Sequence, residues 1–266
     1  MEPFIKVFNF FIHPDPTNAT ELLFVSVVYL ILVAYVLQVL WSVLRLLKLT
    51  FFETFFASRA RPFAVPNPKG EKRILIAGDS TAVGAGATKP EDTIAGRLAH
   101  DFPQADIVNI GINGARTKDA LRAFKTVVGQ KFELAIVSIG GNDIWHFTRI
   151  EKLEQDLNAL LQTAKSVAKG PVILLLYNNI GSSPIFPAFM RRRLKRRGDL
   201  VQELFRFVSQ QEEVPCIELF SKEEDNPFIN EPHRFFSPDG VHPSSDGYRL
   251  WYNRMWRLLV ARGYTF

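Results

Sequence analysis

The stretch Arg73-Ile-Leu-Ile-Ala-Gly-Asp-Ser80 decides the fold of this chain. Its short apolar run breaks at glycine, aspartate and serine, which is typical of a buried parallel strand that ends in a tight turn. Ligands of open parallel sheets bind at the carboxyl ends of the strands, so the Ser80 hydroxyl is well placed for chemistry. By itself, Gly78-Asp79-Ser80 is also an ordinary turn sequence, because all three residue types are common in turns.

Apolar segments of the same kind recur along the chain and alternate with helical patterns. The expected strands cover residues 73–77, 105–110, 134–139, 171–178 and 215–219. The expected helices cover residues 91–101, 116–128, 151–168, 195–211 and 245–262. This alternation predicts an α/β fold, a three-layer α/β/α sandwich whose parallel sheet is covered by helices on both faces. Pro171 and Pro215 are expected to begin their strands, where a missing N–H does least harm.

A second polar segment, Ser237-Pro-Asp-Gly-Val-His-Pro243, lies near the other end of the chain. It offers the carboxylate of Asp239 and the imidazole of His242, three residues apart in a loop bounded by proline and glycine. A serine nucleophile needs a base that takes its proton, and the base needs an acceptor that orients it. Together with Ser80, this segment supplies all three groups.

Two further strand ends carry groups suited to an oxyanion. The apolar run that begins at Leu134 breaks at Gly140-Gly-Asn-Asp143, where the amide of Asn142 can donate a hydrogen bond. The run Ile107-Val-Asn-Ile-Gly-Ile-Asn-Gly-Ala115 enters a glycine turn that can add a backbone N–H. Each segment is modest alone, but all lie at expected strand or loop boundaries.

Taken together, the chain resembles the SGNH (GDSL) hydrolase family of esterases and lipases, over roughly residues 73–266. The matching blocks, in order, are Gly78-Asp79-Ser80, Asn109 to Ala115, Gly140 to Asp143, and Asp239 to His242. The resemblance implies Ser80 as the nucleophile, His242 as the general base and then acid, and Asp239 as the group that orients His242. The fold it implies is a flavodoxin-like parallel sheet.

The resemblance also implies an oxyanion hole. Its donors would be the side chain of Asn142 and the backbone N–H groups of Gly114 and Ser80. Gly111 lies three residues before Gly114 in the same turn and is the alternative glycine.

Three neighbouring side chains have roles that the sequence leaves less sharply defined. Asp79 and Asp143 are expected to hold their turns by hydrogen bonds to backbone. His146 follows the Asn-Asp block and is either a pocket residue or a packed histidine at a strand end.

Competing motifs fail on inspection. Ser80 is followed by Thr81 and Ala82, so the Gly-x-Ser-x-Gly turn of α/β-hydrolases is not present. The segment Gly84 to Lys89 lacks the Gly-Lys-Ser/Thr of a phosphate loop, and the spaced glycines of a dinucleotide fingerprint are interrupted after the first strand. No Cys/His/carboxylate cluster has the spacing of a metal site. The sequence therefore calls for no cofactor and no metal.

The amino-terminal part has a different composition. Leu22 to Leu44 carries no charge and one strongly polar residue, Gln38. Its length as a helix, about 34 Å, is enough to cross a hydrocarbon core of about 30 Å. The expected organisation is a leader over residues 1–21, a transmembrane anchor over 22–50, a juxtamembrane linker over 51–71 and a hydrolase domain over 72–266. A buried core helix and a cleaved signal peptide are the less favoured alternatives.

Flanking charges predict the orientation of the anchor. Arg45, Lys48, Arg59 and Arg61 follow the span, opposed by Glu53, whereas the leader is net acidic. The positive-inside rule then places the catalytic domain on the cytoplasmic side. The single cysteine agrees with a reducing compartment, because it has no internal partner for a disulfide.

A basic segment, Arg191-Arg-Arg-Leu-Lys-Arg-Arg197, follows apolar Phe186, Phe189 and Met190. One interpretation is a membrane-facing element, with the basic groups near anionic headgroups and the apolar side chains inserted. The other is the solvated start of a helix. Nucleic-acid binding is disfavoured, because one basic run beside a membrane anchor is better explained by lipid.

These features favour a membrane-anchored serine esterase that cleaves carboxylic esters or thioesters through an acyl-enzyme, with the bilayer and an ester substrate, acyl or lipid-like, as partners. The same machinery serves a carbohydrate O-acetyl esterase or an acyltransferase. A hypothesis of another class is an inactive membrane-tethered binding protein. The oligomeric state is not determined by the sequence.

Overall fold

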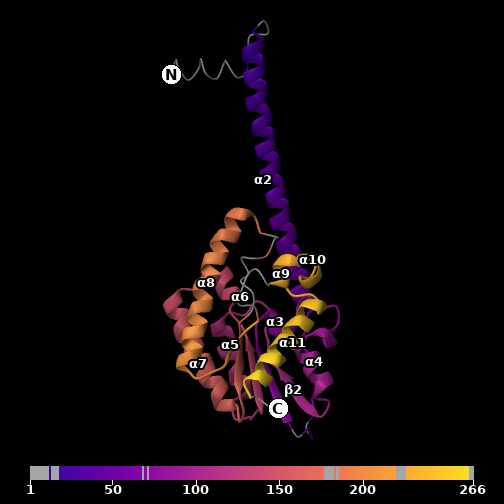
Figure 1. Cartoon of the computed structure of the whole chain (residues 1–266), viewed down its shortest axis with the longest axis vertical. Helices are drawn as coiled ribbons and strands as arrows, with labels where there is room; N and C mark the ends of the chain where they lie inside the picture. The colour runs from indigo at the N-terminus through magenta and orange to yellow at the C-terminus, as the bar shows by residue number, and fades with distance from the viewer. Residues whose placement is uncertain are drawn as a thin grey trace. The chain divides into compact units, whose positions relative to one another are not determined.

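The computed structural model describes residues 12, 18–67, 69–70, 72–176, 183, 186–219 and 226–263. The chain divides into two compact units, Met1–Lys48 and Leu49–Phe266. The larger unit carries the sheet and the candidate site (Figure 1).

In the described part of the larger unit, five strands form one parallel sheet in the order β2-β1-β3-β4-β5. They are β1 (Lys72–Gly78), β2 (Ala105–Asn109), β3 (Leu134–Ser138), β4 (Val172–Leu176) and β5 (Cys216–Glu218). Gly78 pairs with Ser138, and Ile76 pairs with Asn109, so β1, β2 and β3 end close together. This is the flavodoxin-like order, whose ligand sites lie where the connections leave neighbouring strands on opposite faces.

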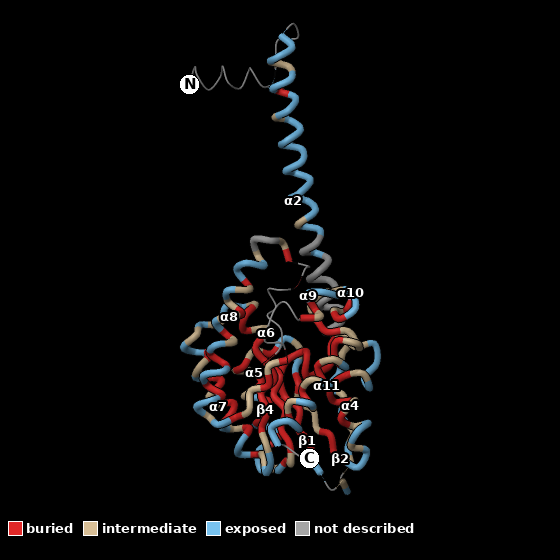
Figure 2. The backbone as a smooth tube through the Cα atoms, viewed as in Figure 1, coloured by how far each residue is buried: buried red, intermediate tan, exposed pale blue. Residues whose placement is uncertain are grey.

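The longer helices cover both faces of the sheet (Figure 1). They are α4 (Ile94–Asp101), α5 (Thr117–Phe124), α7 (Ile150–Val167), α8 (Ala188–Gln211) and α11 (Ser245–Ala261). Alternate strand residues divide between two cores: Leu75 packs with α5, α7 and α8, whereas Ile74 packs with α4 and α11. Figure 2 shows that burial is concentrated in the strands and the inner faces of these helices. The predicted three-layer sandwich is therefore confirmed.

Strand positions agree with the prediction to within one or two residues. Residues 177 and 178, expected to end the fourth strand, lie outside the described residues. Pro171 and Pro215 precede their strands rather than beginning them. Their carbonyl oxygens nevertheless join the ladders, each accepting a backbone N–H at 3.0 Å from the neighbouring strand.

Several one-turn helices were not predicted, because they are too short to show a hydrophobic period. They are α3 (Ser80–Val83), α6 (Gly141–Trp145), α9 (Pro227–Asn230) and α10 (Pro232–Phe235). The 3₁₀ turns η1 (Pro90–Asp92) and η2 (Lys125–Val127) overlap the ranges predicted for the helices 91–101 and 116–128.

Helix α8 begins at Ala188, earlier than the predicted start at residue 195. Arginine and lysine are good helix formers, and buried Leu194 gives this first part of the helix an inner face. The basic segment 191–197 therefore lies in the first turns of α8, in agreement with the interpretation as the start of a helix.

The interpretation that apolar side chains beside this segment insert into lipid is wrong for Phe186. Phe186 is buried, with its ring 5.5 Å from that of Trp145, and Met190 packs against the core. The Phe186 ring is thus part of the protein interior, whereas Met190 is partly buried. The side chain of Phe189 lies outside the described residues.

The amino-terminal helix α2 runs from Ala19 to Arg59, so it extends beyond residue 50 into the segment expected as a juxtamembrane linker. Its stretch Ala19–Leu44 has a mean hydropathy of 2.6 and is long and apolar enough to cross a membrane. A signal sequence near the amino terminus meets the same criteria. Large apolar side chains such as Leu30 and Leu37 are more than 60% exposed within the chain itself.

The segment that follows α2 is bound to the edge of the sheet. Val65 exchanges two backbone hydrogen bonds with Ile107 of β2, at 3.0 and 3.1 Å, in an antiparallel bridge. Asn67 adds bonds from its backbone N–H to the Asp106 carboxylate and from its side chain to the Gln104 carbonyl. The end of the predicted linker therefore packs against the exposed edge of β2.

Candidate active site

The first candidate residue, Ser80, lies in a tight turn at the end of β1. Gly78 has φ +143°, and a Cβ there would lie 1.8 Å from the Ser138 carbonyl oxygen, so only glycine fits beside β3. The Asp79 carboxylate caps α3 by accepting from the Thr81 N–H at 2.9 Å and from the Thr81 hydroxyl at 2.7 Å. The expected turn-holding role of Asp79 is confirmed by these bonds, which present Ser80 at the start of the helix.

The second segment forms a compact loop between α10 and α11. Asp239 Oδ1 accepts the backbone N–H groups of Val241 at 2.8 Å and His242 at 2.9 Å. The His242 carbonyl accepts the N–H of Ser237 at 2.8 Å, which closes the loop. Gly240 has φ +71°, a left-handed conformation that favours glycine. The loop geometry thus follows from the turn residues of this stretch.

The three predicted residues meet across the carboxyl end of the sheet. His242 Nδ1 lies 2.7 Å from Asp239 Oδ2, and His242 Nε2 lies 2.8 Å from Ser80 Oγ. Because a carboxylate only accepts, Nδ1 carries the proton and Nε2 is left to accept the Ser80 O–H. All three side chains are buried.

The charge of Asp239 is maintained inside the protein. Burial alone raises the pKa of this carboxyl, but hydrogen bonds from His242 and from the Val241 N–H outweigh it and hold the pKa below its ordinary value. Asp239 is therefore a carboxylate at neutral pH, as a group that orients and later stabilises a cationic imidazole must be.

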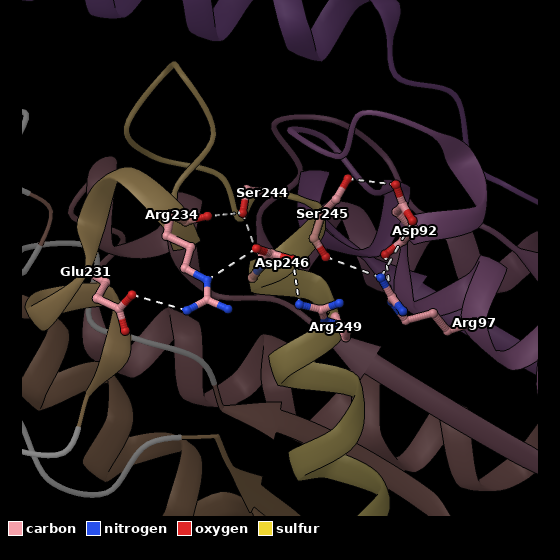
Figure 3. Close-up of polar contacts among 9 residues, drawn as sticks. Asp92, Arg97, Glu231, Arg234, Ser244, Ser245, Asp246 and Arg249 are labelled. Atoms are coloured by element: carbon pink, nitrogen blue, oxygen red, sulfur yellow. Dashed lines mark hydrogen bonds and ion pairs between the residues drawn. The ribbon is translucent and has the colours of Figure 1, made fainter.

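A polar network fixes the chain directly after His242 (Figure 3). The Ser244 hydroxyl caps α11 by accepting the Gly247 N–H and donates to the Arg234 carbonyl at 2.6 Å. Arg234 pairs with Asp246 at 3.3 Å, and the Ser245 hydroxyl donates to Asp92 at 2.8 Å. These contacts attach the start of α11 both to α10 and to the turn before α4.

The oxyanion candidates also lie together. Asn142, the second residue of α6, donates one amide hydrogen from Nδ2 to the Ala115 carbonyl at 3.1 Å, which leaves its second hydrogen for another acceptor. Gly114 has φ +73° and no neighbour within 4 Å of a Cβ position. The Gly111 N–H, in contrast, already donates to Asn109 Oδ1 at 2.9 Å. The geometry thus favours Gly114 over Gly111 as a donor to an external group.

Asp143 joins these two segments. Its Oδ2 accepts both the backbone N–H of Thr117 at 2.9 Å and the Thr117 hydroxyl at 2.7 Å. The expectation that Asp143 holds its own turn is therefore wrong, because its acceptor oxygen reaches the start of α5, 26 residues earlier in the chain. His146, at the end of α6, is exposed, which excludes the packed-histidine interpretation.

One residue of the site escaped the sequence analysis. Gly86 has φ +90°, and a Cβ there would lie 2.5 Å from the Pro243 carbonyl oxygen and 2.7 Å from His242 Cβ. The two glycines after the nucleophile, Gly84 and Gly86, were the available signal. Gly86 allows the loop of His242 to approach the loop of Ser80.

The described residues include no group of three or more His, Cys, Asp or Glu side chains able to hold a metal ion. The site therefore consists of a hydrogen-bonded serine, histidine and aspartate with amide donors nearby. A family model described as the GDSL-like Lipase/Acylhydrolase family matches residues 76–250.

The chain belongs to the GDSL-like lipase/acylhydrolase family. As a member of this family, the protein is a serine hydrolase that acts on esters. A search of curated proteins gave no match.

Solved structures of GDSL proteins share the fold. A lipolytic G-D-S-L protein from Veillonella parvula superposes with a TM-score of 0.57 at 16% identity, covering 71% of this chain and 98% of the other. A lipase/acylhydrolase from Enterococcus faecalis gives 0.55 at 20% identity, covering 72% and 96%. The psychrotrophic esterase EstA from Pseudoalteromonas gives 0.53 at 20% identity, covering 73% and 100%.

Proposed function

We propose that this GDSL-family protein is a membrane-anchored esterase that hydrolyses carboxylic esters or thioesters, with acyl or lipid-like groups, through an acyl-enzyme. The observation that carries the catalytic part is the unbroken chain of hydrogen bonds from Asp239 through His242 to Ser80, with distances of 2.7 and 2.8 Å. Such a chain activates a serine hydroxyl that is otherwise a poor nucleophile.

In this mechanism Ser80 Oγ attacks the ester carbonyl as its proton passes to His242 Nε2. Asp239 stabilises the imidazolium that forms, and His242 then gives the proton to the leaving alcohol or thiol. Water enters, loses a proton to His242 and releases the acid from Ser80. Each half-reaction uses the same base, so one histidine serves both.

The oxyanion of each tetrahedral intermediate would be held by the Ser80 N–H, the Gly114 N–H and the second amide hydrogen of Asn142. The bond from Asn142 to the Ala115 carbonyl supports this assignment, since it orients the amide and ties it to the segment of Gly114. Loss of one such donor typically costs about 3 kcal/mol of transition-state stabilisation.

The first test measures hydrolysis of p-nitrophenyl esters, from acetyl to palmitoyl, by the purified full chain and by Ser80→Ala. We expect activity that is lost in Ser80→Ala, together with labelling of the wild type alone by a fluorophosphonate. A long-chain optimum supports the lipid-like substrate. An acetyl optimum supports an O-acetyl esterase, and transfer to an added alcohol supports an acyltransferase.

If wild type and Ser80→Ala are equally inert toward the esters and the fluorophosphonate, the esterase proposal fails. The membrane-tethered binding protein is then the remaining hypothesis. An active wild type excludes it.

The proposal includes a transmembrane anchor over residues 22–50, a juxtamembrane segment over 51–71 and a cytoplasmic catalytic domain over 72–266. The apolar stretch Ala19–Leu44 and the basic residues that follow it support this arrangement. Single cysteines at Asp15→Cys and Asn230→Cys, in a Cys216→Ser background, test it in intact cells with an impermeant thiol reagent. Labelling at position 230 but not at 15 would reverse the orientation.

A further inference from the structure

The end of helix α2 lies beside the oxyanion segment. Ala60 is the first residue after α2, and its carbonyl accepts the Asn113 side-chain N–H at 3.1 Å. Asn113 directly precedes Gly114. The hydrogen-bonded segment along β2 continues from here toward the amino ends of the strands. The chain therefore joins the catalytic unit at the carboxyl end of the sheet, where the active site lies.

The same carboxyl end of the sheet carries several positive charges. Helix α8 begins there, in contact with α6, and Figure 1 shows its first turns at the same end of the domain as α6, α9 and α10. Four arginines of its first turns have exposed side chains: Arg191, Arg192, Arg193 and Arg196. Among the described residues, Arg191, Arg192 and Arg196 have no carboxylate within ion-pair distance.

Two carboxylates at the starts of other helices have cationic partners of their own. Asp119 at the start of α5 pairs with Arg122 at 3.2 Å. At the start of α11, Asp246 pairs with Arg249 at 2.8 Å and with Arg234. Within the described part of the chain, Arg191, Arg192 and Arg196 thus form a positively charged surface without a paired carboxylate.

Exposed apolar side chains accompany the arginines. Phe147 is 41% exposed and lies in the left-handed region at φ +49°, a conformation that a bulky residue rarely adopts. The Arg193 guanidinium covers one side of its ring at 4.8 Å. Ile112, two residues before Gly114, is 45% exposed. Apolar groups beside arginines are suited to the boundary between lipid headgroups and acyl chains.

We propose that this end of the domain docks on an anionic phospholipid bilayer and holds the active site against the lipid surface. The docking surface is formed by Arg191, Arg192, Arg193, Arg196, Phe147 and Ile112. The positive charge of this docking surface favours anionic headgroups. The proposed membrane anchor also joins the catalytic unit at the same end, beside Asn113. The inference rests on the proposed membrane attachment. It adds the surface that faces the lipid and the headgroup charge that this surface recognises.

The test uses the full chain in nanodiscs of phosphatidylcholine alone or with phosphatidylserine. Hydrogen–deuterium exchange is followed in peptides that cover residues 142–149 and 188–197. We expect slower exchange in the anionic nanodiscs. The triple variant Arg191→Gln, Arg192→Gln, Arg196→Gln should lose this protection, since each basic group contributes about a fivefold gain in association with an anionic surface.

The matched control is Lys69→Gln, Lys125→Gln, Lys131→Gln. It removes the same charge from exposed residues, and Lys69 and Lys131 lie a few residues before the starts of β1 and β3, at the amino end of the sheet. We expect it to keep the protection. Equal exchange in both lipids, or equal loss in the two triple variants, would overturn the inference.

Two readouts on the same samples separate this inference from the proposed function. Co-elution with nanodiscs reports membrane attachment, and hydrolysis of soluble p-nitrophenyl butyrate reports the serine chemistry. The triple arginine variant should be unchanged in both. An incorporated and active protein without lipid-dependent protection therefore contradicts the docking surface alone.

Discussion

At the scale of single residues, Asp239 depends on a particular set of hydrogen bonds. One carboxylate oxygen accepts two backbone N–H groups of its own loop, and the other faces His242 Nδ1. The side chain has no exposed surface. Its charge, and not only its shape, therefore determines which nitrogen of His242 carries the proton.

Replacement of that carboxylate tests the role of its charge. In Asp239→Asn, the amide can donate to Nδ1, which would leave the proton on Nε2 and remove the base for Ser80. We expect kcat for p-nitrophenyl butyrate to fall by about 10³- to 10⁴-fold, with a smaller change in KM. Asp199→Asn, at an exposed surface ion pair, is the control and should retain kcat within about twofold. Similar activity of the two variants would contradict the assigned role.

The lowered pKa of Asp239 also predicts a pH dependence of stability. A carboxyl whose pKa is lower in the folded state stabilises the protein above its ordinary pKa of 3.8, and this contribution is lost as the pH falls through the folded-state value. Thermal unfolding of wild type and Asp239→Asn from pH 7 to pH 3 should show a stability difference that shrinks toward low pH. A difference that grows on acidification would refute the lowered pKa.

Ser80, Asp239 and His242 could be found in the sequence because each stands in a local pattern of its own. An apolar strand that breaks at a serine, and a proline- and glycine-bounded loop with a carboxylate and an imidazole, are both visible over fewer than ten residues. The function of Asp143 was not visible, because its partner Thr117 belongs to another segment.

At the scale of elements, the approach of the Ser80 and His242 loops depends on Gly86. In Gly86→Ala, the new Cβ would collide with Pro243 and His242, and the backbone would remain strained at φ +90°. We expect a loss of unfolding free energy about 1–3 kcal/mol larger than in Gly129→Ala, measured by chemical denaturation. Gly129 is the matched control, since its φ is +85° and nothing lies within 4 Å of its Cβ position.

A kinetic measurement on the same pair tests the function of this contact. A displaced His242 loop should lower kcat in Gly86→Ala and not in Gly129→Ala. If both variants lose the same stability and keep their activity, the close approach has no functional role.

The bond between α5 and α6 can be tested in the same way. Thr117→Val keeps the shape of a fully buried side chain but removes the hydroxyl donor to Asp143. We expect a loss of about 1–3 kcal/mol in unfolding free energy, because the buried carboxylate loses a partner. We also expect kcat to fall, because the bond joins the segments that carry the proposed oxyanion donors Gly114 and Asn142. Thr126 is an exposed residue whose hydroxyl donates to the Ala123 carbonyl, so Thr126→Val should change neither quantity by much. An unchanged kcat in Thr117→Val would contradict the idea that this bond positions the oxyanion donors.

Elements were predicted well where a hydrophobic period was long enough to read. Helix α7 and helix α11 appear within one residue of the expected bounds. The start of α8 was not predicted, because its first turns are mostly arginine and show no hydrophobic period. The buried residues Leu194 and Val201 are too few to reveal one there. The single-turn helices that carry Ser80 and Asn142 show no period at all.

At the scale of the whole molecule, the fate of the amino-terminal helix separates an anchor from a signal sequence. We expect protein extracted from membranes with detergent to keep its full mass of 30.2 kDa and to resist release by alkaline carbonate. Intact-mass spectrometry measures the first property. A shorter species that has lost residues 19–44 would identify a cleaved signal sequence and contradict the anchor.

The sequence by itself determined the class of the fold, the order of its strands and helices, and the identity of the candidate serine, histidine and aspartate. Hydrophobic periods and turn chemistry are local properties, so they can be read within one segment. Only the tertiary structure decided that segment 65–67 lies along β2, that Asp143 bonds to Thr117, and that Gly86 packs against His242. These contacts join segments far apart in the chain, and a local pattern does not specify which loops meet at the edge of a sheet.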